Sequence, residues 1–200
     1  MDANFWDIIR NRRSIYGLSD EKIVSMDRVE QIVRDTLACV PSAFNSQGTR
    51  IVLLFDDHSR KFWKMVLESI RAVTNDEQYA ASEQKIRDSF SGGYGTLLFF
   101  EEQSIMQNMQ TSFPKYAARF PVWSQQSNAM HQFVIWSALE SEGLGASLQH
   151  YDPLVDEAAH KEWNIPETWK LTAQIPFGKP VGVPKEKVET DTDSRIMVFK

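Results

Sequence analysis

The sequence contains a single cysteine, Cys39, among 200 residues. One cysteine cannot form an intrachain disulfide or a cysteine-based zinc site, which favours a reducing compartment, and we expect the cytoplasm. Because Cys39 falls within an apolar helical stripe, we expect its side chain to be packed. The four histidines also lack the spacing of a metal-binding pair on adjacent helical turns, so we expect no metal site.

The sequence also lacks an excess of basic residues. Its 22 lysines and arginines stand against 27 acidic residues, which gives a formal net charge of -5. Nucleic acids and anionic membranes bind net basic surfaces, so we expect neither as a partner. Any anion that binds this protein must therefore be held by a local cluster of cations.

Long apolar runs are absent as well. The longest, residues 51–55 and 96–100, are far too short to span a bilayer. Asp2 stands where a secretory signal would carry basic residues. We therefore expect neither export nor membrane insertion.

The beginning of the chain predicts two helices. The spacing of Phe5 and Ile8 predicts an opening helix of about three turns, capped by Asp2 and ending near Arg12. A second helix begins at a capping-box pair, carries one apolar stripe and ends at a proline. The pair is Asp27 and Glu30, the stripe is Val29, Ile32, Val33, Leu37 and Val40, and the proline is Pro41.

Strands and helices alternate further along the chain. Residues 49–55 and 95–101 predict buried strands, residues 171–177 predict a strand with period-two alternation, and residues 57–73 predict a helix. Residues 127–142 are apolar nearly all round, as in a helix that is covered on several sides. This order of elements indicates an α/β or α+β layer fold.

Glycines and polar loops mark the remaining boundaries. The glycine cluster at residues 91–95 leads into a strand rather than a helix, so we interpret it as a turn and not as a phosphate-binding loop. Gly143 and Gly145 end the long helix, and residues 146–151 follow as an extended run. The tail begins as a polar loop and finishes in a short strand-like stretch. We find no second domain boundary and expect one domain over residues 1–200.

Three short polar clusters are candidates for ligand binding. Arginine and lysine supply charge-assisted hydrogen bonds to phosphate, and amide side chains pair with the donors and acceptors of a flat heterocycle. Each cluster alone is more often an ordinary solvated loop. The clusters are Arg12, Arg13 and Ser14; Ser42, Asn45 and Gln47; and Lys185 with Lys187.

The segments "NRRSIYGLSDE", "PSAFNSQGTRIVLLF", "GLGASLQHY" and "PKEK" together resemble the flavin-binding segments of the nitroreductase family, in the family's order. More narrowly, "SGGYGTLLFFEEQ" and "SLQHYDPLVDE" resemble the fatty-acid-repression-type branch of nitroreductase-like proteins. The likeness extends over nearly the whole chain. It implies an α+β homodimer with a central, mostly antiparallel sheet flanked by helices, and one FMN per subunit at the dimer interface, touched by both chains.

The resemblance also assigns roles to particular residues. The basic-basic-hydroxyl motif would grip the flavin phosphate with the two tail lysines, the amide loop would reach the ring and the ribityl chain, and an extended segment would pass the N5 edge. The residues are Arg12, Arg13, Ser14, Lys185 and Lys187 for phosphate, Ser42, Asn45 and Gln47 for the ring and ribityl chain, and Gln149, His150 and Tyr151 for the edge. No side chain is expected to be an essential acid or base, because the flavin carries the hydride chemistry.

The implied activity is an FMN-dependent, ping-pong transfer of electrons from NADH or NADPH to nitroaromatics, quinones or similar acceptors. Flat substrates gain from stacking, so an aromatic cluster could wall the shared pocket, or it could fill the core or the dimer interface. The cluster is Phe113, Tyr116, Phe120 and Trp123. Two alternatives stay open: a flavin-binding regulatory protein for lipid or redox signalling with little turnover, and a structural domain whose basic clusters are only solvated.

Overall fold

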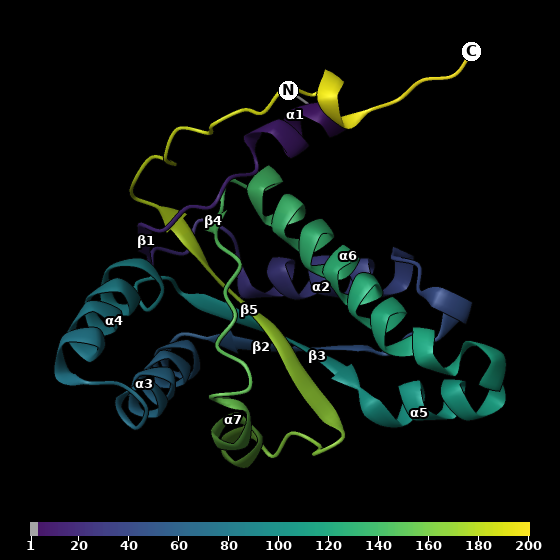
Figure 1. The fold of residues 1–200 in the computed structure, drawn as a ribbon. Helices are drawn as coiled ribbons and strands as arrows, with labels where there is room; N and C mark the ends of the chain where they lie inside the picture. Colours follow the sequence, from purple (N-terminus) through teal and green to yellow (C-terminus); the bar gives the residue numbers. More distant parts are fainter. Residues whose placement is uncertain (1–3) are drawn as a thin grey trace.

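The computed structural model describes residues 4–200, and a five-stranded sheet forms its centre (Figure 1). The strand order is β1-β5-β3-β2, the short β4 pairs with β5 beside β1, and all of these pairs are antiparallel. The strands are β1 (Leu18–Ser19), β2 (Thr49–Phe55), β3 (Gly95–Glu102), β4 (Gly145–Ala146) and β5 (Trp169–Pro180). The expected mostly antiparallel sheet is confirmed, as are the three predicted strands, although most residues of β2 are half-buried rather than buried.

β3 is buried on both faces, which explains its nearly continuous apolar sequence. Successive residues of a strand point to opposite faces, and the core is divided accordingly. Leu97 and Phe99 belong to one buried apolar cluster, whereas Leu98 and Phe100 belong to another. The sheet therefore has a layer of helices on each side.

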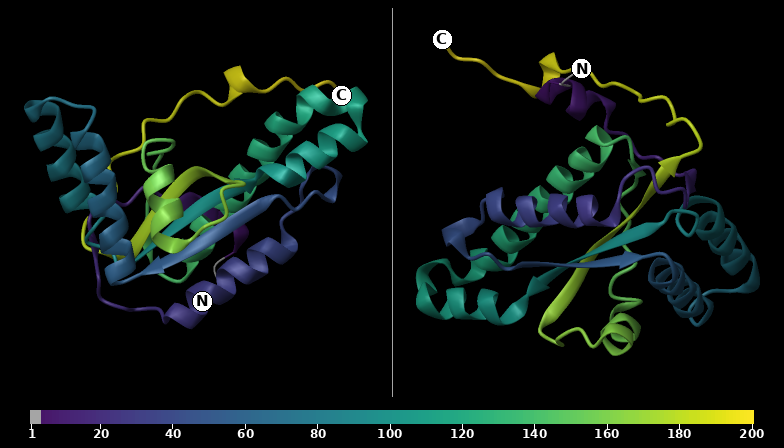
Figure 2. Two further views of the ribbon diagram at one scale, coloured as in Figure 1. Left: turned by 90° about the horizontal axis from the view of Figure 1, so that it is seen from below. Right: turned by 180° about the vertical axis from the view of Figure 1, so that it is seen from behind.

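The cluster that contains Leu97 is covered by α2 (Met26–Cys39) and α6 (Phe120–Ser141). The cluster that contains Leu98 is covered mainly by α3 (Asp57–Arg71) and α4 (Asp76–Ser89). Figures 1 and 2 show the third and fourth helices at one end of the sheet and the fifth at the other. The α-helices are α1 (Phe5–Asn11), α2 (Met26–Cys39), α3 (Asp57–Arg71), α4 (Asp76–Ser89), α5 (Gln103–Ser112), α6 (Phe120–Ser141) and α7 (Asp156–Trp163). Three short 3₁₀ turns are η1 (Ala43–Asn45), η2 (Pro114–Arg119) and η3 (Asp193–Arg195).

The starts of the first two helices differ from the prediction. The predicted cap Asp2 lies outside the described residues, and Asn4 Oδ1 accepts hydrogen bonds from the backbone N–H groups of the first turn of α1. α1 has seven residues, about two turns, and gives way to Arg12 as expected. α2 begins before the predicted Asp27 box, because the Ser25 side chain accepts the hydrogen bond from the Arg28 N–H.

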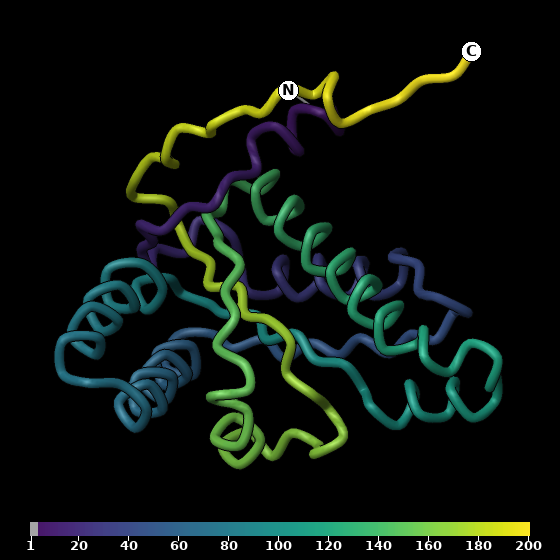
Figure 3. Tube along the Cα trace, in the orientation of Figure 1, coloured from purple at the N-terminus to yellow at the C-terminus, as the bar shows by residue number. Residues whose placement is uncertain are grey.

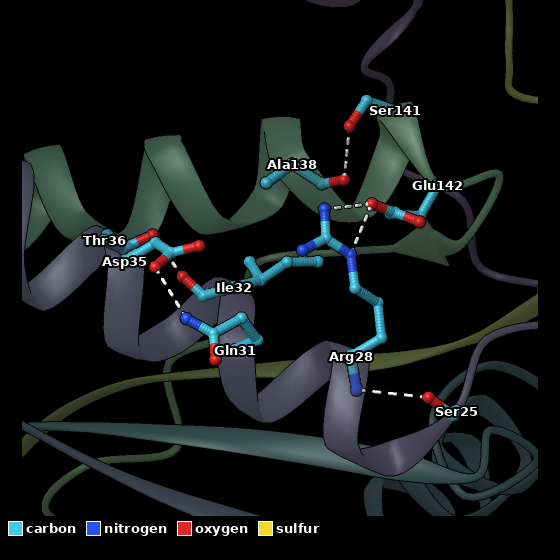
Figure 4. A network of polar contacts seen from close by, with 9 residues as sticks. All are labelled: Ser25, Arg28, Gln31, Ile32, Asp35, Thr36, Ala138, Ser141 and Glu142. Atoms are coloured by element: carbon cyan, nitrogen blue, oxygen red, sulfur yellow. Dashed lines mark hydrogen bonds and ion pairs between the residues drawn. The ribbon is translucent and has the colours of Figure 1, made fainter.

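α6 is longer than predicted, since it begins at Phe120 rather than near residue 127. Gly143, with φ of 82°, follows its last turn and confirms the predicted glycine stop. Figure 4 shows how this end of α6 is fastened to α2: Arg28 Nη2 lies 2.6 Å from Glu142 Oε1. Arg28 Nε donates to the same oxygen at 2.9 Å.

Two other expectations are wrong. Cys39 is exposed, because α2 ends at this residue and the described part of the chain leaves its side chain uncovered. The strand expected at the end of the tail is absent: after β5 the chain runs as an exposed, extended tail with only η3 as regular structure (Figure 3). Among residues 4–200, no helix is both long and apolar enough to cross a bilayer.

Candidate functional site

A cavity of about 510 Å³ lies between α6, β5 and the extended segment 149–152. Its volume is in the range of small-molecule sites in proteins. Polar and apolar side chains alternate along its wall: Glu101, Gln103, Met106, Pro121, Ser124, Gln125, Asn128, Ala129, Gln132, His150, Asp152, Lys170, Leu171 and Thr172. Of these, only His150 was singled out from the sequence.

One wall of the cavity is a buried hydrogen-bond network built on Glu101. The Glu101 carboxylate accepts from Asn128 Nδ2 at 2.9 Å and from Ser124 Oγ at 2.5 Å. Asn128 Oδ1 in turn accepts from Gln132 Nε2 at 2.7 Å and from Thr172 Oγ1 at 3.2 Å. These bonds fix the amide groups on one face of α6, so the cavity has a pre-organised polar wall.

A pair of acidic residues lies close to this cavity. Asp152 lines the cavity, whereas Asp156 lines a neighbouring one, and Oδ1 of each is buried without a hydrogen-bond partner. Burial raises the pKa of the Asp156 carboxyl and the charge of Asp152 raises it further, against the opposing effects of His160 and Lys170.

The basic motif pairs with the strand that precedes the extended segment of the cavity. Ser14 forms a parallel bridge with Ala146, and the Ile15 N–H donates to the Ala146 carbonyl at 2.9 Å. This pairing places residues 12–14 beside the segment that leads to Gln149. The structure thus brings together the basic motif and the extended segment, which are far apart in the sequence.

The two arginines of the motif have different surroundings. Arg13 Nη2 donates to the carbonyl of Lys185 and so ties the tail to the motif, with Lys187 exposed two residues further on. The Arg12 guanidinium carbon lies 4.1 Å from the centroid of the Trp136 ring. Arg12 Nε is buried without a hydrogen-bond partner.

Burial lowers the pKa of the Arg12 guanidinium, and the charge of Arg13 lowers it further, while Glu140 acts in the opposite direction. A cation with a buried, unsatisfied donor beside a second cation is stabilised by an anion. Trp136 is one helical turn from Gln132, which lines the cavity. An elongated ligand with its anionic end at Arg12 would have its other end in the cavity.

The extended segment 149–151 contributes unequally. The Gln149 backbone pairs with Gln174 in both directions, and its side chain donates to Ser147 Oγ at 3.1 Å. The Tyr151 ring packs at 5.7 Å from the Trp63 ring in the core under α3, and burial raises its pKa. The segment therefore offers His150 and main-chain groups to the cavity, whereas the Tyr151 ring faces the core.

The amide loop lies on another side of α6. Ser42 and Gln47 line a separate cavity of about 260 Å³, and Asn45 lines neither cavity. Gln47 N–H donates to Ser42 Oγ at 2.9 Å, and three residues of the loop have positive φ. Within one chain, this loop is not brought to the basic motif, although the sequence assigned both to the same ligand.

The four predicted aromatic residues gather around Phe44, a residue that sequence reasoning missed. Ring centroids lie 4.8 Å away for Phe113, 5.8 Å for Tyr116, 5.4 Å for Phe120 and 5.8 Å for Trp123. Phe120 is buried and the Phe44 side chain remains half exposed. The cluster therefore packs against itself and still presents an aromatic surface next to Asn45.

A groove between the end of α2 and the outer side of α6 is almost entirely apolar. Large apolar side chains on α6 are unusually exposed there, with Met130 and Phe133 at 41% and Val134 at 39%. Such a surface on a single chain is typical of a protein contact. The groove is lined by Cys39, Val40, Pro41, Gln126, Ala129, Met130, Phe133 and Val134.

Comparison with known proteins gives one consistent family. The nitroreductase family model matches residues 9–179. Nitroreductase FRM2 of Saccharomyces cerevisiae is 33% identical over 187 residues, which are 92% of each chain. Nitroreductase CinD of Lactococcus lactis, solved with 4-nitrophenol, is similar with a TM-score of 0.89 and 39% identity, over 98% of this chain and 100% of that one. A nitroreductase of Desulfovibrio desulfuricans in complex with FMN shares the fold with a TM-score of 0.69 and 18% identity, over 100% of this chain and 99% of that one.

Proposed function

The chain belongs to the nitroreductase family and is a flavin-dependent oxidoreductase, and from this premise we propose that it passes electrons from NADH or NADPH to nitroaromatics, quinones or similar electron-poor acceptors. We propose FMN as the flavin. When bound, FMN supplies the hydride-accepting ring, and the protein supplies binding, orientation and electrostatics. The observation that carries the proposal is Arg12, whose buried Nε has no hydrogen-bond partner and whose guanidinium lies over Trp136. Trp136 is one helical turn from Gln132, which lines a cavity large enough for a flat ring.

The phosphate would be held by Arg12, Arg13 and Ser14. Its second pKa is near 6, so it carries close to two negative charges at neutral pH and can accept several charge-assisted hydrogen bonds. Arg13 already fixes the tail through the Lys185 carbonyl, which keeps the lysines of the tail close to the same place.

The flat ring would occupy the cavity, between the polar wall of α6 and His150. Asn128 and Gln132 are fixed by mutual hydrogen bonds, so their remaining polar atoms are positioned in advance of binding. His150 shapes the wall and has no assigned role in proton transfer. The Asp152 and Lys170 side chains also line the cavity and were not expected from the sequence.

We propose that the protein is a homodimer in which a second copy completes each site. Ala43 N–H and Ser127 Oγ are 3.4 Å apart, which places the amide loop near residue 127 of α6, whereas Arg12 lies over Trp136. These two points are about 14 Å apart along the helix axis, and the loop faces a different side. The partner's loop, brought in by contact across the apolar groove, would supply Ser42, Asn45 and Gln47.

We propose that donor and acceptor use one pocket in turn, because the chain has no second nucleotide motif for the nicotinamide. The partner's Phe44 would then bring its aromatic surface to the open side of the ring, with Phe113, Tyr116 and Trp123 supporting it. CinD binds 4-nitrophenol, a flat aromatic ligand of the kind that such a surface would stack on.

The visible spectrum of the purified protein tests the proposal. A flavin spectrum that NADH or NADPH bleaches without oxygen, and that an added nitroaromatic restores, is the expected result. A protein that stays colourless when FMN is added would refute flavin binding. A bound flavin that neither nicotinamide bleaches would favour the regulatory alternative. We keep the cytoplasm as the expected compartment, because one cysteine allows no intrachain disulfide.

A further inference from the structure

Trp136 makes the closest contact of the Arg12 guanidinium with an aromatic ring, and it is not part of any motif in the sequence. Its ring centroid lies 4.1 Å from the guanidinium carbon, while that of Phe133 lies at 5.8 Å. In the described part of the chain, no hydrogen bond or ion pair reaches the Arg12 side chain. The orientation of this side chain therefore depends on the surface it lies on.

The neighbouring arginine shows the contrast. Arg13 donates to the Lys185 carbonyl, so part of its hydrogen-bonding capacity is used within the protein. Arg12 has all five donors of its guanidinium free, and its Nε is withdrawn from water. A planar guanidinium that stacks on an indole points its N–H groups sideways, parallel to the indole ring. A phosphate at the edge of the guanidinium can then accept two hydrogen bonds from it.

We propose that Trp136 is a positioning residue that holds Arg12 flat, with its donors directed toward the phosphate of FMN, and so makes the site prefer FMN over riboflavin. This inference rests on the proposed function, because it concerns the same site. It adds that the preference for the phosphate depends on a tryptophan of α6 that need not touch the ligand. The rigid helix fixes the indole, and the indole fixes the cation.

The surrounding charges agree with this assignment. Glu140, one turn beyond Trp136 on the same helix, is the nearby acidic residue that favours the charged form of Arg12. Burial raises the pKa of the Glu140 carboxyl, and Arg12 lowers it. Glu140 forms no ion pair with Arg12 within the described residues, so the donors of Arg12 stay available to a ligand.

The test compares FMN and riboflavin, whose structures differ by the phosphate. Dissociation constants are measured from flavin fluorescence for the wild type, Trp136→Leu and Trp136→Phe. We expect Trp136→Leu to weaken FMN about tenfold, consistent with a partly desolvated cation–π contact, and riboflavin less than about twofold. Trp136→Phe keeps a ring under the cation and should recover most of the FMN affinity.

Two controls separate positioning from general damage. Trp163→Leu removes a half-buried tryptophan of α7, away from Arg12, and should leave the ratio of the two affinities unchanged. In an Arg12→Ala background, Trp136→Leu should have no further effect on FMN, because a positioning residue acts through the group it positions.

The results separate the inference from the proposed function. If Trp136→Leu weakens both ligands equally, or changes neither, the inference is wrong while wild-type FMN binding stands. If the wild type binds neither flavin, the proposed function itself fails. If Trp136→Leu does not fold, Trp136→Phe is the test. A loss of FMN affinity of about two- to threefold, with riboflavin affinity unchanged, supports the inference. No change in FMN affinity, or an equal loss for both ligands, overturns it.

Discussion

Replacing Arg13 with alanine should weaken FMN binding much more than riboflavin binding. Arg13 is half-buried, follows α1 closely and holds the Lys185 carbonyl, so it connects the basic motif to the tail lysines. The substitution removes one cation from the proposed phosphate site and also releases the tail. Riboflavin has no phosphate, and its affinity reports only damage to the rest of the site.

The expected size follows from the kind of bond that is lost. A hydrogen bond to a charged group contributes about 1.5 to 3 kcal/mol, which corresponds to a loss of FMN affinity between about tenfold and somewhat over a hundredfold. The interaction is between partly exposed charges, so salt should weaken it. The Debye length falls from about 10 Å at 0.1 M to about 3 Å at 1 M salt, and the difference between wild type and variant should shrink accordingly.

The assay is titration of the flavin-free protein with FMN and with riboflavin at low and high salt, followed by fluorescence. Arg10→Ala is the matched control, because it removes the same charge from an exposed side chain whose ion-pair partner is Asp7 at 3.5 Å. Arg13→Gln separates the two roles of the residue: an amide can still donate to the Lys185 carbonyl but carries no charge.

The three variants should differ in how much FMN affinity they lose. FMN affinity should fall for both Arg13 variants, more for alanine, and remain nearly unchanged for Arg10→Ala. Equal losses of FMN and riboflavin would refute the phosphate assignment. A loss of FMN affinity that does not depend on salt would refute its electrostatic basis, and a loss as large for Arg10→Ala would show that net charge, rather than position, decides binding.

Three further predictions concern assembly, turnover and pH. Ile135→Glu places a carboxylate in a fully buried position between α2 and β3, so circular dichroism and light scattering should show unfolding or dissociation with release of flavin; a folded monomer that retains FMN would contradict the shared site. Steady-state kinetics should give parallel double-reciprocal lines, and His150→Ala should change rate or acceptor choice only modestly; intersecting lines would reject a shared pocket, and complete loss of turnover with FMN bound would reveal chemistry at His150. Burial, with a smaller effect of Asp56, raises the pKa of Tyr94 to about 12, so the native state keeps this proton while the unfolded chain loses it near pH 10. The contribution of Tyr94 to the free energy of unfolding should therefore be fully present below about pH 10 and be lost between pH 10 and 12. Tyr94→Phe should remove this part of the fall, and an identical pH dependence in the variant would show that Tyr94 is not its source.

The sequence predicted the elements whose apolar patterns are continuous or regular. β2 and β3 were found because continuous apolar runs of this length have few other possibilities, and α3 because its apolar face is regular. α4 was missed because Ile86 is its one fully buried residue and its apolar pattern is weak. The signal that could have found it was the capping box, in which Asn75 and Gln78 satisfy each other's backbone N–H groups.

The candidate site was recovered in part, and the reason is geometric. The basic motif and the segment after Gly145 were recognised as separate pieces, but the bridge between Ser14 and Ala146 that joins them is a long-range pairing. The sequence predicted that the segment from Gln149 to Tyr151 passes the flavin edge, but not that the Tyr151 ring packs against Trp63, because the direction of this ring depends on how residues 149–151 pair with β5. Phe44 and the polar wall of the cavity had no distinguishing pattern in the sequence.

By itself, the sequence determined the family and the three long strands of the sheet, because these depend on residue types in a fixed order along the chain. Only the tertiary structure decided that Arg13 is tied to the tail and that Arg12 lies free over Trp136, since two adjacent arginines are equivalent until other elements pack around them. It also decided that the amide loop lies across α6 from the basic motif. The physical reason is the same in each case: which side chains meet is determined by strand pairing and helix packing between segments that are far apart in the sequence.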